Sequence, residues 1–251
     1  MNDPTTRGRR SRIRGAPATA LCPTVNGVDQ TARIYRYVVR YDSGTAPRPF
    51  DGICSLAVCK PSIRARAQVG DWIVGFRSRH PGDVVYAMQV TERITLGQYW
   101  HDPRFANRRP RATPYPDNFY RPREDGKLEQ VPNPVHGPAN SAKDCSGLHV
   151  LLSDRFWYFG RDSVPLPNHL LHLVQTTQGH AVHVNRRPGD VAELRAWLAN
   201  WPAGRLGVPI DDRGARIARD PKRTGIDDEP VVEARGAGKR VRRPTVRSCG
   251  T

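Results

Sequence analysis

The chain has 251 residues, a net charge of +16 and a hydrophobic fraction of 37%. Those values favour one packed domain with unpacked tails, because the apolar content is too low to pack the whole chain. No apolar run approaches the roughly 20 residues of a membrane-spanning helix, and the arginine-rich start lacks the apolar segment of a secretion signal. The five cysteines are odd in number and unevenly spaced, which argues against a disulfide framework.

Much of the positive charge lies at the two ends of the chain. Residues 1–16 carry five arginines against one aspartate, and residues 212–251 carry eleven basic against six acidic residues. Both ends are rich in Gly, Pro and Arg and lack hydrophobic periodicity, which is typical of disorder. We predict disordered basic tails over residues 1–32 and 212–251, on either side of one domain over residues 33–211.

The charge also indicates the partner and the compartment. A polycation gains affinity for nucleic acid by releasing counterions from the phosphates. We therefore expect nucleic acid, DNA rather than RNA, or a nucleotide as the partner, and no membrane. The expected location is the cytoplasm, with association with the nucleoid as a further possibility.

The first elements of the domain read as strands separated by turns. Residues 33–41 predict a strand from their β-branched and aromatic content, with one face formed by Tyr35, Tyr37, Val39 and Tyr41. A Gly/Pro loop over residues 42–52 precedes a short apolar piece, residues 53–58. The basic residues 62–68 fit either a helical turn or a strand. Residues 72–76 and 83–91 predict an antiparallel pair of strands.

The second half of the domain is less regular. Residues 106–142 have no periodicity and are too long for a simple connection, which is typical of a functional or disordered loop. Residues 148–152 predict a strand, and residues 156–160 form an aromatic cluster that fits the core. Residues 188–201 predict a helix with an apolar stripe. The fold class is therefore α+β, a mostly antiparallel sheet with peripheral helices.

Several segments, in this order, carry a family resemblance: residues 37–42 (YVVRYD), 47–50, 54–61 (CSLAVCKP) with Arg64, 69–75 (VGDWIVG), 86–91, 99–105, 150–153 with Phe156, 158–160 and 179–180. Together they resemble the nucleotide modification associated domain family, second type, over about residues 34–211. The resemblance implies a setting in which modified DNA bases are made or handled. The Gly-Asp turn at residues 70–71 and the strand after it also resemble the PUA and EVE modules that read modified bases. That likeness implies a twisted sheet or small β-barrel.

Base recognition requires aromatic planes, hydrogen-bonding groups and phosphate contacts close together. The candidate binding residues are Arg40, Asp42, Phe50, Lys60, Arg64, Tyr99, Trp100, Asp102 and Arg104. Several have a structural alternative: Tyr99 and Trp100 fit a core, Asp42 fits a turn, and Lys60 and Arg64 fit a solvated basic face.

The candidate catalytic residues are Asp42, Cys54 and His180. A thiolate needs a base or positive charge nearby, and Cys54 and Cys59 have Lys60 and Arg64 close in sequence. The alternative is that both thiols are buried and inert. The cysteine and histidine spacings fit no zinc motif, and no phosphate-loop or dinucleotide motif is present, so we expect no metal and no cofactor.

Three functions remain open after the sequence alone. The first is a PUA-like module that recognises a modified base. The second is an enzyme acting on a nucleotide or base in a DNA hypermodification or phage-defence pathway. The third is a basic adaptor that binds polyanions through its tails.

Overall fold

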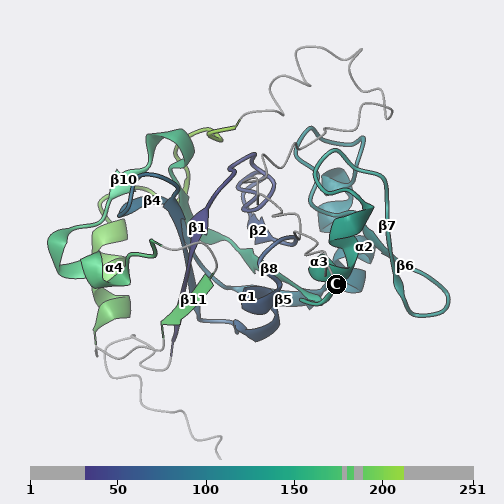
Figure 1. Ribbon diagram of the computed structural model, residues 1–251, viewed down its shortest axis with the longest axis horizontal. Helices are drawn as coiled ribbons and strands as arrows, with labels where there is room; N and C mark the ends of the chain where they lie inside the picture. Colours follow the sequence, from purple (N-terminus) through teal and green to yellow (C-terminus); the bar gives the residue numbers. More distant parts are fainter. Residues whose placement is uncertain (1–31, 177–179, 184–188, 212–251) are drawn as a thin grey trace, which may run out of the picture.

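A computed structural model describes residues 32–176, 180–183 and 189–211 (Figure 1). The two predicted tails therefore lie outside the described residues, apart from Ala32. The described part is an α+β structure, as predicted. Of its helices, none combines the length and apolar character needed to cross a bilayer.

The larger sheet has the strand order β11-β1-β3-β4-β9-β12, with β10 paired to β4. Its strands are β1 (Ile34–Val39), β3 (Trp72–Arg77), β4 (Asp83–Gln89), β9 (Arg155–Tyr158), β10 (Val164–Pro165), β11 (His180–His183) and β12 (Gly204–Arg205). The predicted antiparallel pair is confirmed, because β3 and β4 pair antiparallel. β1 pairs parallel with β3, and β12 pairs parallel with β9.

A smaller sheet has the order β2-β8-β5, from β2 (Cys54–Leu56), β8 (His149–Ser153) and β5 (Glu92–Thr95). A separate hairpin joins β6 (Tyr120–Pro122) to β7 (Leu128–Gln130), inside the segment that showed no periodicity. The sequence alternative of a small closed barrel is wrong for the described residues, because the sheets are open and end in edge strands.

The helices are short: α1 (Pro61–Arg66), α2 (Leu96–His101), α3 (Ser141–Cys145) and α4 (Asp190–Leu198). α1 settles the helix-or-strand alternative, and α4 confirms the predicted helix. α2 begins with a capping box, in which Gln98 N donates to Thr95 Oγ1 (3.1 Å) and Thr95 N donates to Gln98 Oε1 (2.8 Å).

Both faces of the larger sheet are buried, so its strands carry apolar residues at successive positions. One face packs against α4 through a cluster that includes Ile34, Trp72, Val74, Val191 and Leu194. The other face packs against the smaller sheet and α1 through Tyr35, Tyr37, Val39, Leu56 and Ile63. The predicted shared face of residues 35, 37 and 39 is confirmed, whereas Tyr41 lies beyond the strand and is 58% exposed.

A third apolar cluster covers the far side of the smaller sheet. It joins α2 and the hairpin to β8, through Leu96, Tyr99, Phe119, Tyr120 and Val150. The layers therefore run from α4 through the larger sheet and the smaller sheet to α2 and α3, which is the left-to-right order in Figure 1.

Candidate active site

Cys59 lies in a tight turn between β2 and α1. Its φ is +59° and that of Lys60 is +41°, two consecutive non-glycine residues in the left-handed region. Such backbone costs of order 1–3 kcal/mol per residue and is concentrated at functional sites. A sharp strand-to-helix turn is also how hydrolases present a nucleophile.

The thiol of Cys59 meets a histidine and an aspartate from distant parts of the chain. His136 Nε2 lies 3.3 Å from Cys59 Sγ, and His136 Nδ1 lies 2.5 Å from Asp144 Oδ2. Asp144 also accepts the backbone N–H of Cys59 (2.9 Å) and the hydroxyl of Tyr120 (2.9 Å). Cys59, His136 and Asp144 thus form a thiol–imidazole–carboxylate triad, the arrangement that activates a nucleophile.

Burial in the triad increases from the thiol inward. Cys59 is partly exposed, the His136 side chain is 16% exposed, and that of Asp144 is 2% exposed. Burial alone would lower the pKa of His136, but its hydrogen bonds to Asp144 and Cys59 outweigh burial and raise that pKa to about 10. Burial likewise opposes ionisation of Asp144, yet its bonds to His136 and Tyr120 lower the pKa of that carboxyl. His136 is therefore strong enough as a base to hold a proton taken from the thiol.

Arg64 fixes the backbone around the triad. Its guanidinium donates to the carbonyl oxygens of Cys59 (2.7 Å), Asp144 (2.5 Å) and His149 (2.8 Å). The side chain is fully buried, and a Cβ at Gly147 would lie 2.9 Å from its Cζ. Arg64 therefore joins the Cys59 turn, α3 and β8, and its burial leaves it away from any phosphate in solution.

Two ammonium groups add positive charge beside the Cys59 turn. Lys60 Nζ lies 4.5 Å from the ring centroid of Tyr37. Burial lowers the pKa of Lys60, the charge of Cys59 opposes that shift, and repulsion from Lys143 lowers it further. The surroundings of the thiol thus favour an anionic substrate.

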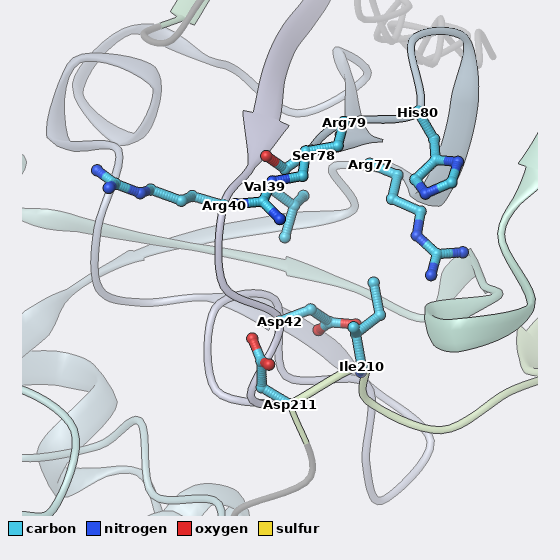
Figure 2. Close-up of a pocket in the computed structure, with 9 residues that line it drawn as sticks. All are labelled: Val39, Arg40, Asp42, Arg77, Ser78, Arg79, His80, Ile210 and Asp211. Atoms are coloured by element: carbon cyan, nitrogen blue, oxygen red, sulfur yellow. The ribbon is translucent and has the colours of Figure 1, made fainter.

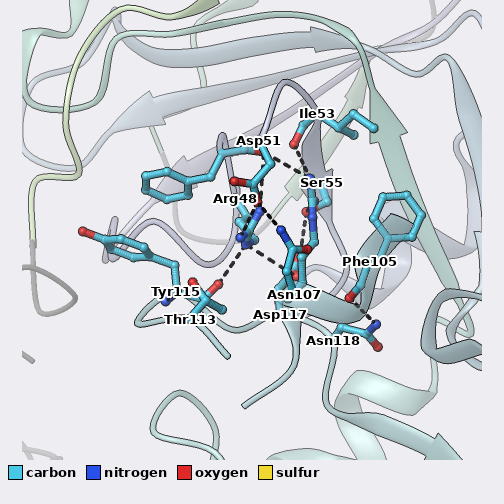
Figure 3. A network of polar contacts seen from close by, with 12 residues as sticks. Arg48, Asp51, Ile53, Ser55, Phe105, Asn107, Thr113, Tyr115, Asp117 and Asn118 are labelled. Atoms are coloured by element: carbon cyan, nitrogen blue, oxygen red, sulfur yellow. Dashed lines mark hydrogen bonds and ion pairs between the residues drawn. The ribbon is translucent and has the colours of Figure 1, made fainter. Parts of the chain in front are cut away.

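A second polar network, behind β2, is structural (Figure 3). Asp117 is fully buried and accepts the hydroxyls of Ser55 and Tyr99, the latter at 2.9 Å. Arg48 Nε lies 3.9 Å from Asp117, and Arg108 donates to Ser55 Oγ (3.0 Å). Burial raises the pKa of Asp117, although the two arginines oppose that shift. None of these five side chains is more than 2% exposed, so they hold loops together and do not contact a ligand.

The structure separates the predicted site residues. Tyr99 is buried in the third apolar cluster, and Cys54 is buried, which raises the pKa of its thiol. Trp100 is partly buried, with the Arg109 guanidinium 4.4 Å from its ring centroid. Arg104 forms exposed ion pairs with Asp102 and Glu92, both at 2.7 Å.

Three further predicted residues lie elsewhere. Phe50 stacks on Tyr115 with ring centroids 4.3 Å apart. Arg40 and Asp42 line a separate cavity (Figure 2). The backbone of His180 lies in β11, and its side chain is outside the described residues. Of the predicted residues whose side chains the structure describes, Lys60 and Arg64 lie beside the triad.

Sequence reasoning missed His136 and Asp144 and ranked Cys54 above Cys59. His136 is 77 residues from Cys59, inside a segment without periodicity, so no local spacing connects the two. The available signal was the succession of an apolar piece, Cys59, and Pro61 at a helix start, which predicts a strand–turn–helix unit.

The triad residues are arranged in line, with the imidazole between thiol and carboxylate. Among the described residues, no three histidine, cysteine or acidic side chains are grouped so that they can hold one metal ion. An imidazole that contacts the thiol on one side and a carboxylate on the other is an arrangement suited to nucleophilic chemistry at the thiol.

Comparison with known proteins gives the family. A family model described as nucleotide modification associated domain 2 matches residues 31–215. That match covers well over half of the chain, so the protein belongs to this family, and the resemblance seen in the sequence is confirmed. No curated protein and no solved structure matches the chain. The family associates the protein with nucleotide or DNA modification.

Proposed function

We propose that the protein is an enzyme of nucleotide or DNA-base modification that transfers an acyl group through a thioester on Cys59. The observation that carries the proposal is the 3.3 Å contact between Cys59 Sγ and His136 Nε2, with Asp144 on the other ring nitrogen. The family supplies the nucleotide setting. The triad supplies the reaction type, because cysteine–histidine pairs oriented by a third group act on acyl carbons.

His136 Nε2 is placed to take the proton of the Cys59 thiol, and the neighbours of His136 raise the pKa of its imidazole to about 10. The Cys59 thiolate attacks the acyl carbon and forms a C–S bond. The bond from that carbon to the leaving group breaks, and His136 gives its proton to the leaving group. An amine or hydroxyl of the nucleotide, or water, then attacks the thioester carbon and returns a proton to His136. The C–S bond breaks, which restores the thiolate.

Asp144 is a positioning residue in this sequence. It accepts the Nδ1 proton of His136 and thereby turns Nε2 toward the thiol. It also accepts the N–H of Cys59, so one carboxylate orients both the base and the nucleophile.

An artificial acyl donor tests the proposal without knowledge of the natural substrate. p-Nitrophenyl acetate should give a burst of nitrophenolate and an acetyl group on Cys59, seen in the intact mass and in the peptide that contains Cys59. Cys59→Ser should remove the burst, and His136→Asn should slow it by about 10²-fold or more. Cys145→Ser is the matched control, because Cys145 is a second partly exposed thiol. Equal acetylation of Cys59 and Cys145, or a burst unchanged in the His136 variant, would contradict the proposal.

Recognition of a modified base without turnover is the second candidate function. It is supported by the partly exposed Phe50–Tyr115 stack, above which the Arg205 guanidinium lies 5.1 Å from the Phe50 ring centroid. Aromatic planes with a nearby guanidinium suit a base taken out of its stack. Phe50→Ala should then lower the preference for an oligonucleotide with modified cytosine over its unmodified match, and an unchanged preference would reject this function. DNA binding, action in phage defence and a cytoplasmic location remain proposals of the same kind.

A further inference from the structure

A further site lies beyond the C-terminal ends of β1 and β3, two parallel strands inside the larger sheet. β1 and β3 run in the same direction, so the residues that follow them meet at this end of the sheet. A cavity of about 200 Å³ lies here, lined by Val39, Arg40, Asp42, Arg77, Ser78, Arg79, His80, Ile210 and Asp211. The outer edge of the carboxyl ends of parallel strands is where open sheets commonly bind ligands.

The basic groups in this cavity lack carboxylate partners. Within the part of the chain that the structure describes, no carboxylate lies at ion-pair distance from Arg40, Arg77 or Arg79. Some arginines elsewhere are paired, as Arg104 is with Glu92 and Arg121 is with Glu129. Three arginines without a carboxylate at that distance therefore line one cavity.

One of these arginines is already held in place. Arg77 donates to the carbonyl of Arg161 (3.1 Å) and to Ser163 Oγ (3.0 Å), which fixes its side chain. Arg40 and Arg79 are exposed and able to adjust to a ligand. Figure 2 shows the guanidinium of Arg40 directed away from that of Arg77, so Arg40 reaches a phosphate at Arg77 only after its side chain changes rotamer. A fixed guanidinium with adjustable ones at the same cavity suits the oxygens of a phosphate group.

The wall of the cavity that faces Arg77 and His80 carries two aspartates, which limits the chemistry of the rest of the ligand. Figure 2 shows Asp42 and Asp211 across the cavity from Arg77 and His80. The Asp42 carboxylate already accepts hydrogen bonds within the protein: Tyr158 Oη donates to both its oxygens (2.8 Å each), and Ile210 N donates to one of them (3.2 Å). Asp211 leaves a carboxylate for a donor such as a ribose hydroxyl or a base amine. A ligand with a phosphate at one end and such a donor at the other matches both walls.

We propose that this cavity binds the phosphate of a nucleotide unit, either free or within a nucleic-acid strand. The cavity takes one phosphate with its sugar rather than a longer segment. The site is separate from the Cys59 triad, so binding here does not depend on chemistry there.

Calorimetric titration of the full chain at fixed salt tests the site with three probes: inorganic phosphate, dCMP and a short single-stranded oligonucleotide. The variant Arg40→Gln/Arg79→Gln removes two exposed charges, and Arg121→Gln/Arg123→Gln removes the same charge from the exposed hairpin. We expect the cavity variant to lose about tenfold or more in affinity, since it removes hydrogen bonds between charged groups, and the hairpin variant to change less than twofold.

The probes separate the two sources of phosphate. Cavity-dependent binding of dCMP points to a free nucleotide, and cavity-dependent binding of the oligonucleotide alone points to a strand. Equal losses in both double variants would mean that net charge alone is responsible and would overturn the site, as would no binding of any probe. Cys59→Ser should bind as the wild type does, so failure of the thiol chemistry and failure of this site give different results.

Discussion

The Cys59 thiol and the His136 imidazole meet across 77 residues of chain, with Sγ 3.3 Å from Nε2. The Asp144 carboxylate holds both the Cys59 N–H and the His136 ring, and Arg64 holds the backbone carbonyls of Cys59 and Asp144. The reactivity of the thiol should therefore depend on residues that never touch a substrate.

The pH profile of alkylation measures the contact directly. Its neighbours raise the pKa of His136 to about 10, and an imidazolium 3.3 Å from Sγ stabilises a thiolate, so iodoacetamide should alkylate Cys59 of the wild type even at pH 6.5. In His136→Asn the rate should instead rise with pH through about 8.5, as for an ordinary thiol, and should be about tenfold lower than wild type at pH 6.5. Peptide mass spectrometry follows Cys59, with Cys145 as internal control. Coincident profiles for the two proteins would show that His136 does not act on the thiol.

His136 should also make stability depend on pH. Its pKa is raised in the folded state, so its contribution is complete below about pH 6.5 and is lost as the pH rises through about 10. The wild type should exceed His136→Asn in unfolding free energy by about 2–3 kcal/mol at pH 6, and this difference should shrink by pH 10.5. Urea unfolding at both pH values gives the comparison. A difference that grows with pH would have the wrong sign for this ion pair.

Arg64→Met should both destabilise the fold and lower the reactivity of the Cys59 thiol. The substitution leaves three carbonyl oxygens without their shared donor, which should cost about 3 kcal/mol. Arg66→Met, at an exposed position of the same helix, is the matched control. The checks are urea unfolding and the rate of Cys59 alkylation at pH 7. A wild-type rate of alkylation in a folded Arg64 variant would show that the Cys59 turn keeps its shape without the hydrogen bonds from Arg64.

Asp42 should make the free energy of unfolding fall as the pH rises, which is opposite to the effect of a carboxylate in an ion pair. Burial raises its pKa to about 6, and the hydroxyl of Tyr158 only partly offsets that shift. The folded state therefore favours the protonated acid, and stability is lost as the pH rises from about 4 through 6. The wild type should lose about 3 kcal/mol relative to Asp42→Asn over that range, as seen by chemical unfolding. Asp125→Asn, on the exposed hairpin, serves as the control.

Asp117 should matter for stability alone. Asp117→Asn removes the only fully buried carboxylate beside Arg48 and Arg108 in the described network, which should cost about 3–5 kcal/mol. Asp51→Asn, which removes a 47% exposed partner of Arg48, should cost about 1 kcal/mol or less. Thermal unfolding of the two variants measures these losses of stability. Similar losses would mean that Asp117 is not ionised in the folded protein.

The sequence predicted elements with strong local patterns. The strand around Tyr35 and Tyr37, the pair β3–β4 and the helix α4 follow from alternation or a helical stripe, and all are confirmed. The hairpin β6–β7 was not predicted, because its strands have three residues each and too little length for alternation to show. The same segment carries His136, the base of the triad. His136 was therefore missed because no secondary structure was predicted around it.

The site predictions failed where tertiary contacts decide a side chain's role. Arg64 fits a phosphate clamp in sequence, but three carbonyl acceptors enclose it in the fold. Cys54 and Cys59 share the same local basic residues, and only the turn geometry brings one of them out of the core. Neither acceptor carbonyls nor a left-handed turn at cysteine has a sequence signature.

The path of the chain between β1 and β3 limits how this protein can be rebuilt. β1 and β3 are neighbours in the larger sheet, yet the connection between them contributes β2 to the smaller sheet and carries Cys59. Neither sheet is a continuous stretch of chain, so neither can be transplanted or exchanged between relatives as a module. Recombination within this family should therefore succeed only where both sheets come from the same parent, and the thiol turn is inherited with the crossover that contains it.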